Sequence, residues 1–280
     1  MAVIVKPERT VIVSDFHMGR PYAAVASPDA LRPLWRGASR LIVNGDAAEL
    51  HHPHYRDDAQ RQLRRLSQLC EDDGVELTLL SGNHDPFVSS GRHLVLEHNR
   101  VFITHGDALH PAIAPWSLDA KVIRKAYDEA FAQVHPEHRN KLDEILRVSE
   151  VAAMSQWMPE NFRQRHGGVL ELLIRPQMIP RILHYWHTIP RLAENFAKTH
   201  MPDAQFFILG HTHRHGVWRF NGLTVINTGC FGFPGRPLAV VIENASLSVF
   251  KILRHGGRYE LAPRSRQIFK LAPPPSEHEA

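Results

Sequence analysis

The sequence has few cysteines and no long apolar run, and each absence excludes a class of protein. Its two cysteines, Cys70 and Cys230, can form at most one disulfide, so the chain is not a disulfide scaffold. Neither belongs to a CxxC pair, which favours a reducing compartment. No window of about 18 residues is apolar and uncharged, so we expect no membrane-spanning helix. The first residues include Lys6, Glu8 and Arg9 and do not resemble a signal peptide.

The chain also lacks a strong charge of either sign. Its 33 lysines and arginines against 29 acidic residues give a formal net charge of +4, which is too mild to indicate a nucleic-acid partner. Hydrophobic residues make up 43% and charged residues 22%, as in an ordinary folded domain, so a disordered chain is excluded. Histidine is abundant, with 20 copies. Because histidine is a common metal ligand and acid–base group, its positions are the first place to look for chemistry.

Five short apolar runs are typical of buried strands, and each ends in a polar segment with aspartate, histidine or asparagine. The runs are 11–13, 41–43, 77–80, 101–103 and 206–209. Between the second and third runs, leucines at helical spacing predict a helix over 57–73, which Gly74 ends. This order predicts an α/β core. Ligands gather at the carboxyl ends of strands in such sheets, so the polar segments are expected to meet in one pocket.

Residues 108–204 separate the fourth polar segment from the fifth and carry helical patterns over 116–134 and 142–149. The stretch 168–196 is apolar but is interrupted by three prolines, so we expect short pieces there rather than one helix. We interpret residues 108–204 as a helical cap inserted into the core.

Beyond residue 210 the pattern changes to closely spaced strand-like runs with a hairpin turn at Asn221-Gly222, which predicts a second, antiparallel sheet. The last nine residues contain three prolines and are expected to be disordered. The predicted division is a core over 1–107 and 205–271, the cap over 108–204, and a disordered tail over 272–280.

The polar segments contain metal-ligand residue types at suitable spacing. Asp15 and His17 are two residues apart, so both side chains point the same way from an extended segment. His211 and His213 repeat this spacing with two imidazoles. Asp46 lies at a tight turn, where its two oxygens could bridge two ions. Further ligand types are at Asn83, His84, Asp85 and His105. A mixed nitrogen and oxygen set suits manganese, iron or zinc better than calcium.

Five ordered blocks carry a family resemblance. They are Asp15-x-His17, Gly45-Asp46-x-x-Glu49, Gly82-Asn83-His84-Asp85, His105-Gly106-Asp107 and Gly210-His211-x-His213. Together they resemble the blocks of the calcineurin-like metallophosphoesterases, over residues 9–107 and 205–252. The resemblance implies a four-layer α/β/β/α sandwich with a dinuclear metal centre that hydrolyses phosphoesters.

The resemblance also implies residue roles, carried over by position in the blocks. The centre would hold two divalent ions, with manganese expected first and iron or zinc as alternatives. One ion would be held by Asp15, His17, Asp46 and His213. The other would be held by Asp46, Asn83, His105 and His211. A hydroxide between the ions would attack phosphorus. His84 would contact or protonate the substrate beside Asn83, and Asp85 would orient His84. Glu49 and Asp107 would orient ligands or loops.

The substrate is less defined by the sequence. His110 and Arg214 adjoin the blocks, so each is expected either to contact substrate or to pack and face solvent. The histidines at 51, 52 and 54 are expected in a solvated loop. Residues 163–200 combine six cations and two acids with large apolar side chains. Such a segment packs on the core or in a homodimer, or binds an amphiphilic phosphate or an anionic membrane face.

The insert, together with Arg214 after the last block, is similar to UDP-2,3-diacylglucosamine hydrolases of lipid A synthesis, which cleave a pyrophosphate. Their third block typically reads Gly-Asn-Arg-Asp, whereas position 84 here is histidine. The alternatives are therefore such a pyrophosphate hydrolase, a nuclease, or a non-catalytic scaffold on the same fold. We expect a cytoplasmic protein, with peripheral contact to the inner membrane face if the cap binds lipid.

Overall fold

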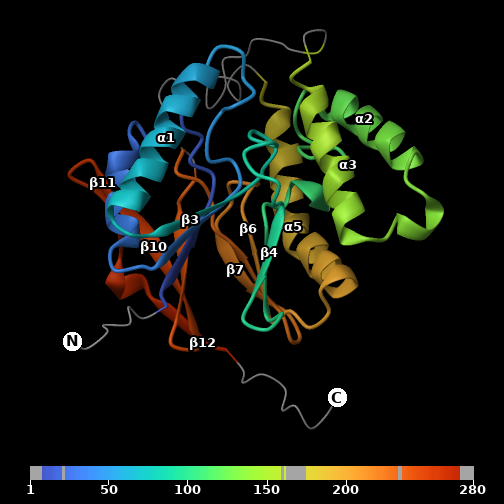
Figure 1. Ribbon diagram of the computed structural model, residues 1–280. Helices are drawn as coiled ribbons and strands as arrows, with labels where there is room; N and C mark the ends of the chain where they lie inside the picture. Colours follow the sequence, from blue (N-terminus) through green and yellow to red (C-terminus); the bar gives the residue numbers. More distant parts are fainter. Residues whose placement is uncertain (1–7, 21–22, 159–160, 162–174, 233–234, 272–280) are drawn as a thin grey trace.

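The computed structural model describes residues 8–20, 23–158, 161, 175–232 and 235–271 (Figure 1). The first of its two sheets has the strand order β11-β10-β9-β1-β2-β3, with β12 paired to β10. Its strands are β1 (Thr10–Val13), β2 (Arg40–Asn44), β3 (Glu76–Leu80), β9 (Leu238–Glu243), β10 (Ser246–His255), β11 (Arg258–Leu261) and β12 (Gln267–Lys270). Strands β1, β2 and β3 are parallel, with Ile12 opposite Ile42, and β9 runs antiparallel to β1. The carboxyl ends of β1, β2 and β3 therefore share one edge.

The second sheet has the order β4-β5-β6-β8-β7. Its strands are β4 (His93–Leu96), β5 (Val101–Thr104), β6 (Phe206–Leu209), β7 (Gly216–Arg219) and β8 (Thr224–Asn227). Strands β5, β6 and β8 are parallel, and β4 and β7 close the edges in antiparallel pairs. The three parallel strands again bring their carboxyl ends to one edge.

Alternate side chains of the central strands enter different hydrophobic cores, as strands buried on both faces require. In β1, Val11 and Val13 pack outward beneath helix α1 (Arg56–Asp72), whereas Ile12 enters the core between the sheets. In β6, Phe207 packs outward against helix α5 (Met178–His200), whereas Ile208 faces the other sheet. Figure 1 shows α1 and α5 on opposite sides of the two sheets. The predicted four-layer α/β/β/α sandwich is confirmed.

All five predicted strands form, as do the helix that ends before Gly74 and the hairpin at Asn221-Gly222, which joins β7 to β8. The prediction of a separate antiparallel sheet beyond residue 210 is wrong. Strands β7 and β8 complete the second sheet, and β9 and β10 extend the first. The physical reason is burial: Ile226 and Val240 meet in the core between the sheets, which a separate sheet would not provide.

Between β5 and β6 lie helices α2 (Ala120–Ala132), α3 (Leu142–Ser155) and α5. Helices α2 and α3 pack on each other through Ile123, Ala152 and Ala153. Short 3-10 turns are η1 (Pro28–Trp35), η2 (Asp107–Leu109), η3 (Pro136–His138) and η4 (Pro263–Ser265). The core and cap boundaries stay a prediction, although α5 covers the second sheet itself. Residues 163–174 of the predicted basic segment and the predicted disordered tail lie outside the described residues.

The expectation that prolines divide the apolar stretch is wrong for residues 178–200, which form one helix, α5. Pro180 lies in the first turn, where a backbone N–H has no partner within the helix. Pro190 lies inside the helix and is buried. In the part of the chain that the structure describes, no helix has the length and apolar character needed to cross a membrane.

Candidate metal centre

The predicted ligands lie in the loops that follow the strands, where the backbone turns sharply. Asp15, His17, Asp46, His211 and His213 all have positive φ, between 50° and 64°. Few residues other than glycine adopt this left-handed conformation, and it costs about 1–3 kcal/mol where it occurs. The fold maintains it at five predicted ligands, and each turn directs a side chain back toward the same edge of the sheets.

Two glycines of the blocks leave space for ligand side chains. A Cβ atom at Gly45, which has φ +79°, would lie 2.3 Å from Nδ1 of His105. A Cβ atom at Gly210 would lie 2.3 Å from Oδ2 of Asp15. Any side chain at these positions would displace the ligand beside it, which explains why glycine precedes Asp46 and His211.

The structure brings the seven predicted ligands into one connected cluster. Asp15, Asp46 and His105 each place a ligand atom within 4.8 Å of the others. His17 Nε2 lies 3.0 Å from His213 Nε2 and 3.8 Å from Asp46 Oδ2. Six of the seven residues are at most 5% exposed, and only the His213 side chain, at 35%, reaches the surface. Carboxylates buried this deeply need positive partners.

Asn83 and His211 form the other end of the cluster. His211 Nδ1 lies 2.8 Å from Asn83 Oδ1, and its ring centroid is 5.4 Å from that of His105. The backbone N–H of His211 donates to the Asp15 carboxylate at 3.2 Å, which connects the first block to the last. The seven residues therefore enclose one compact site rather than two separate ones.

Hydrogen bonds on the far side of three imidazole rings select the tautomer that a metal ligand needs. His17 Nδ1 donates to Glu49 Oε1 at 2.8 Å, and His105 Nδ1 donates to the Asn44 carbonyl at 2.8 Å. His211 Nε2 donates to the Ile113 carbonyl at 3.1 Å. In each neutral ring the remaining nitrogen then directs its lone pair into the cluster.

The pKa shifts of His17 and His211 agree with this assignment, whereas that of His105 does not. Burial, with Arg20 nearby, lowers the pKa of His17 to about 4. Burial, with His105 nearby, lowers the pKa of His211 to about 4, so both rings are neutral. Burial also acts to lower the pKa of His105, but the Asp46 carboxylate outweighs it and raises the pKa to about 10. In the metal-free protein a proton on His105 therefore stands in for a cation.

Two features show that divalent cations fit this cluster. His105 Nε2 is buried without a well-directed hydrogen bond, although Asp46 Oδ2 lies 3.2 Å away. His211 Nδ1 lies 2.8 Å from Asn83 Oδ1, and both atoms are of types that bind divalent cations. Carboxylate, imidazole and amide ligands together suit first-row divalent ions.

His84 lies at the open side of the cluster, with its side chain 21% exposed. Its Nδ1 donates to Glu49 Oε2 at 2.9 Å, so the fully buried Glu49 holds both His17 and His84. Burial acts to lower the pKa of His84, but the carboxylates of Glu49 and Asp46 outweigh it and raise the pKa. The sequence singled out Glu49 as an orienter, and its contacts agree.

Arg20 was missed by sequence reasoning. Its Nε contacts Glu49 Oε1 at 2.6 Å, its Nη2 lies 3.3 Å from His84 Nδ1, and 39% of its side chain is exposed. A cation three residues after His17 was the available signal. Its partly exposed side chain gives the open side of the cluster a positive group.

The structure directs Asp85 away from the imidazole of His84. Its carboxylate accepts the backbone N–H groups of Gly82, Asp46, Ala47 and Ala48, at 2.6–3.2 Å. Asp85 therefore holds the turn that presents Asp46. Asp107 is likewise occupied, in a buried 2.6 Å ion pair with Arg92.

Two predicted substrate contacts pack against the protein. His110 Nδ1 accepts the Ala112 N–H at 3.0 Å, and its ring is 5.9 Å from that of Tyr185. Arg214 donates to the carbonyl of Trp186 and lies 5.5 Å from the Trp218 ring centre. Neither is brought to the ligand cluster by a described contact.

The histidine-rich loop that follows Glu49 contributes aromatic contacts beside His84. The His52 ring stacks on Tyr55 at 3.8 Å and lies 5.7 Å from Trp157, which is itself 5.8 Å from His84. His51 packs edge-on to Phe87, whose side chain is 60% exposed. This loop therefore forms a partly aromatic wall next to the site.

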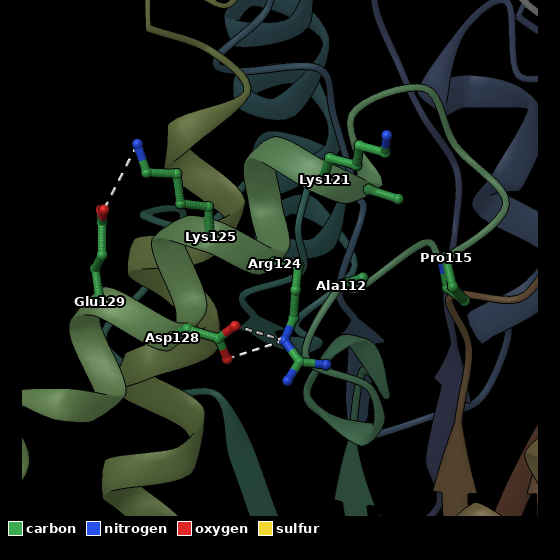
Figure 2. Close-up of a pocket in the computed structure, with 8 residues that line it drawn as sticks. Ala112, Pro115, Lys121, Arg124, Lys125, Asp128 and Glu129 are labelled. Atoms are coloured by element: carbon green, nitrogen blue, oxygen red, sulfur yellow. Dashed lines mark hydrogen bonds and ion pairs between the residues drawn. The ribbon is translucent and has the colours of Figure 1, made fainter.

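A cavity of about 500 Å³ lies against α2 and is lined by Ala112, Arg124 and Asp128 among others. Figure 2 shows Arg124 directed at Asp128 and Lys125 directed at Glu129, so these two cations are paired. None of the predicted ligands lines this cavity. The candidate site is therefore the ligand cluster and not this pocket.

The comparison with protein families agrees with the blocks. The model of the calcineurin-like phosphoesterase superfamily domain matches residues 9–245, most of the chain. No curated protein matches the sequence. Similar solved structures include the phosphoesterase Yfce of Escherichia coli, with 14% identity, TM-score 0.43, and coverage of 94% of this chain and 100% of the other.

Two further structures are similar at the same level. A predicted phosphoesterase of Streptococcus pneumoniae has 15% identity, TM-score 0.41, and coverage of 94% and 97%. Vps29 of Entamoeba histolytica complexed with zinc has 13% identity, TM-score 0.40, and coverage of 94% and 99%. On the match of the family model over residues 9–245, the chain belongs to the calcineurin-like phosphoesterase superfamily.

Proposed function

We propose that the protein is a metal-dependent phosphoester hydrolase with a dinuclear centre. The observation that carries this proposal is the single buried cluster of seven ligand side chains around Asp46, with three imidazole tautomers already selected by partners outside the cluster. Asp15, His17 and His213 would hold one ion, Asn83, His105 and His211 the other, and Asp46 would bridge them. Bound ions would supply an activated water and neutralise the phosphate.

The residues at the open side of the cluster would handle the substrate. Arg20 would bind phosphoryl oxygens, because its guanidinium is exposed and matches phosphate geometry. His84 would give a proton to the leaving oxygen from Nε2, because Nδ1 is bonded to Glu49 and the carboxylates favour the protonated ring. Glu49 would orient His84 and His17 together. Asp85 would hold the Asp46 turn in place of orienting His84.

A narrower form of this proposal is that the substrate is amphiphilic. The outer surface of α5 favours this form. Ile179 and Leu183 are 43% and 55% exposed, and Arg181 beside them is exposed. Exposed apolar side chains next to a cation suit a lipid-bearing phosphate, as in the pyrophosphate hydrolases that the sequence resembles. Membrane contact at this surface, a homodimer and cytoplasmic location stay predictions.

The test is an activity screen of the metal-loaded protein against phosphate monoesters, diesters and sugar-nucleotide pyrophosphates, with and without a lipid chain. Turnover that needs added divalent metal and disappears in Asp46→Asn supports the proposal. Metal binding without turnover of any phosphate substrate would favour the scaffold alternative instead. Salt-sensitive binding and cleavage of DNA would favour the nuclease.

A further inference from the structure

A thiol lies beside the metal centre, outside the five blocks. Cys230 follows β8 and is 2% exposed. Its Sγ and one ring nitrogen each of His17 and His213 all lie within 4.8 Å of one another. The other cysteine, Cys70, lies on the buried face of α1 and packs in a hydrophobic core, whereas Cys230 belongs to none of the hydrophobic clusters among the described residues. The two buried thiols therefore have different surroundings.

The loop that carries Cys230 is fixed to the first and last blocks. Asn227 Nδ2 donates to the Gly210 carbonyl at 2.7 Å, and Asn227 Oδ1 accepts the Gly229 N–H at 2.9 Å. Thr228 Oγ1 and Ser14 Oγ, the neighbour of Asp15, are 2.6 Å apart. These bonds hold the loop against the segments that carry the predicted ligands. They therefore fix the position of the thiol beside the metal centre.

The sulfur is also oriented locally. The backbone N–H of Gly232 donates to Sγ at 3.2 Å, so the sulfur acts as an acceptor on that side. Amide donors to a ligand atom are the kind of outer contact that supports metal coordination. One ring nitrogen each of His17 and His213 lies within 4.8 Å of the same sulfur. This leaves a sulfur lone pair available toward the ion that Asp15, His17 and His213 would hold.

We propose that Cys230 supplies a sulfur ligand to this ion, an inference that rests on the proposed dinuclear function. Binding replaces the S–H proton with a metal–sulfur bond, and the proton leaves to solvent. The ion then has carboxylate, imidazole and thiolate ligands, whereas the ion near Asn83 and His211 has no sulfur. Thiolate favours zinc, iron(II) or cobalt over manganese or magnesium. The two positions therefore select different metals, and manganese is restricted to the second.

Cobalt(II) loading of the full chain tests the inference without reference to activity. Visible ligand-field bands report that cobalt is bound, and a near-ultraviolet charge-transfer band reports a cobalt–sulfur bond. We expect both signals in the wild-type protein and in Cys70→Ala, and only the ligand-field bands in Cys230→Ala. The ratio of zinc affinity to manganese affinity should also fall about ten- to a hundredfold in Cys230→Ala, the range typical when a group that supports a metal site is removed.

The outcomes separate this inference from the proposed function. Cobalt bound without the charge-transfer band in wild type and Cys70→Ala overturns the sulfur ligand and leaves the metal centre intact. No bound cobalt in any variant overturns both. A band that persists in folded Cys230→Ala also overturns the inference. Because Cys70→Ala leaves Cys230 as the only thiol of the chain, its spectrum decides the question even if Cys230→Ala does not fold.

Discussion

Arg214 donates a hydrogen bond to the carbonyl oxygen of Trp186, which lacks its usual backbone donor within helix α5. In an α-helix this carbonyl would accept the N–H of residue 190, and Pro190 has none. The indole Nε1 of Trp186 in turn donates to the Thr212 carbonyl at 2.8 Å. Helix α5 is thereby clamped to the block that carries His211 and His213, and the arginine compensates for the proline.

We expect Arg214→Ala to destabilise the protein by about 1–2 kcal/mol, because a partly buried carbonyl loses its donor. Pro190→Ala restores an N–H that can reach the same carbonyl, so in that background the loss from Arg214→Ala should be smaller. Urea unfolding of the four proteins of this double-mutant cycle measures the coupling. Equal losses in both backgrounds would show that Arg214 does not compensate for Pro190.

Asp46→Asn should reduce the metal content of both proposed sites. Asp46 Oδ2 lies 3.2 Å from His105 Nε2 and 3.8 Å from His17 Nε2, and a neutral amide cannot supply anionic oxygens in both directions. Elemental analysis after dialysis, with melting temperatures with and without metal, measures the effect. Asp58→Asn, on the surface of α1, is the matched control. Full metal content in Asp46→Asn would exclude a bridging role.

Local sequence patterns predicted the strands and the strand ends at which the site forms. They did not predict all of the pairing between strands. Val11, Ile12 and Val13 read as a buried strand from their own sequence. The antiparallel pairing of β9 with β1 joins Val241 to Val11, far apart in the sequence, and no local signal specifies it. The sequence therefore indicated that strands exist after residue 210 but could not assign them to a sheet.

The same limit applies to the site. The blocks predicted the ligands because each block follows directly on a strand and two of them carry a pair in one turn, as with Asp15 and His17. Cys230 reaches the site through the path of a longer loop, which local spacing does not encode. Arg20 lies only three residues after His17, but its spacing alone does not show that it contacts Glu49. For Arg214, which follows His213, the sequence left open whether it contacts substrate or packs against the protein. Neighbouring side chains on a chain generally point in different directions, and here Arg214 points to Trp186.

Arg20→Ala should raise KM for phosphate substrates about ten- to a hundredfold and weaken inhibition by inorganic phosphate. The guanidinium is the exposed cation next to His84, and a charge-assisted contact contributes about 1.5–3 kcal/mol. Arg20→Lys should recover part of the affinity, because it keeps the charge but not the paired donors. Arg64→Ala, on the exposed face of α1, is the control. A fall in kcat with unchanged KM would instead assign Arg20 to holding Glu49.

His84→Ala should lower kcat by roughly 10²–10⁴, the usual scale for a positioned proton donor, while metal content stays the same. Loss of metal from this variant would instead identify His84 as a ligand. Its Nδ1 contact with Glu49 explains why the effect should be on proton transfer: the 2.9 Å hydrogen bond orients the ring, and Nε2 remains for the substrate.

The pH profile of Glu49→Gln separates the electrostatic role of this buried carboxylate from its packing. Burial alone lowers the pKa of His84, and Glu49 and Asp46 together raise it above its usual value. Glutamine keeps the shape of the side chain but removes one negative charge, so the pKa of His84 should fall. A proton donor works only while protonated, and the alkaline limb of the kcat profile should therefore move to lower pH. Exposed Glu71→Gln on α1 should leave the limb in place. An unmoved limb in Glu49→Gln, with His84→Ala still impaired, would mean that Glu49 positions His84 without setting its protonation.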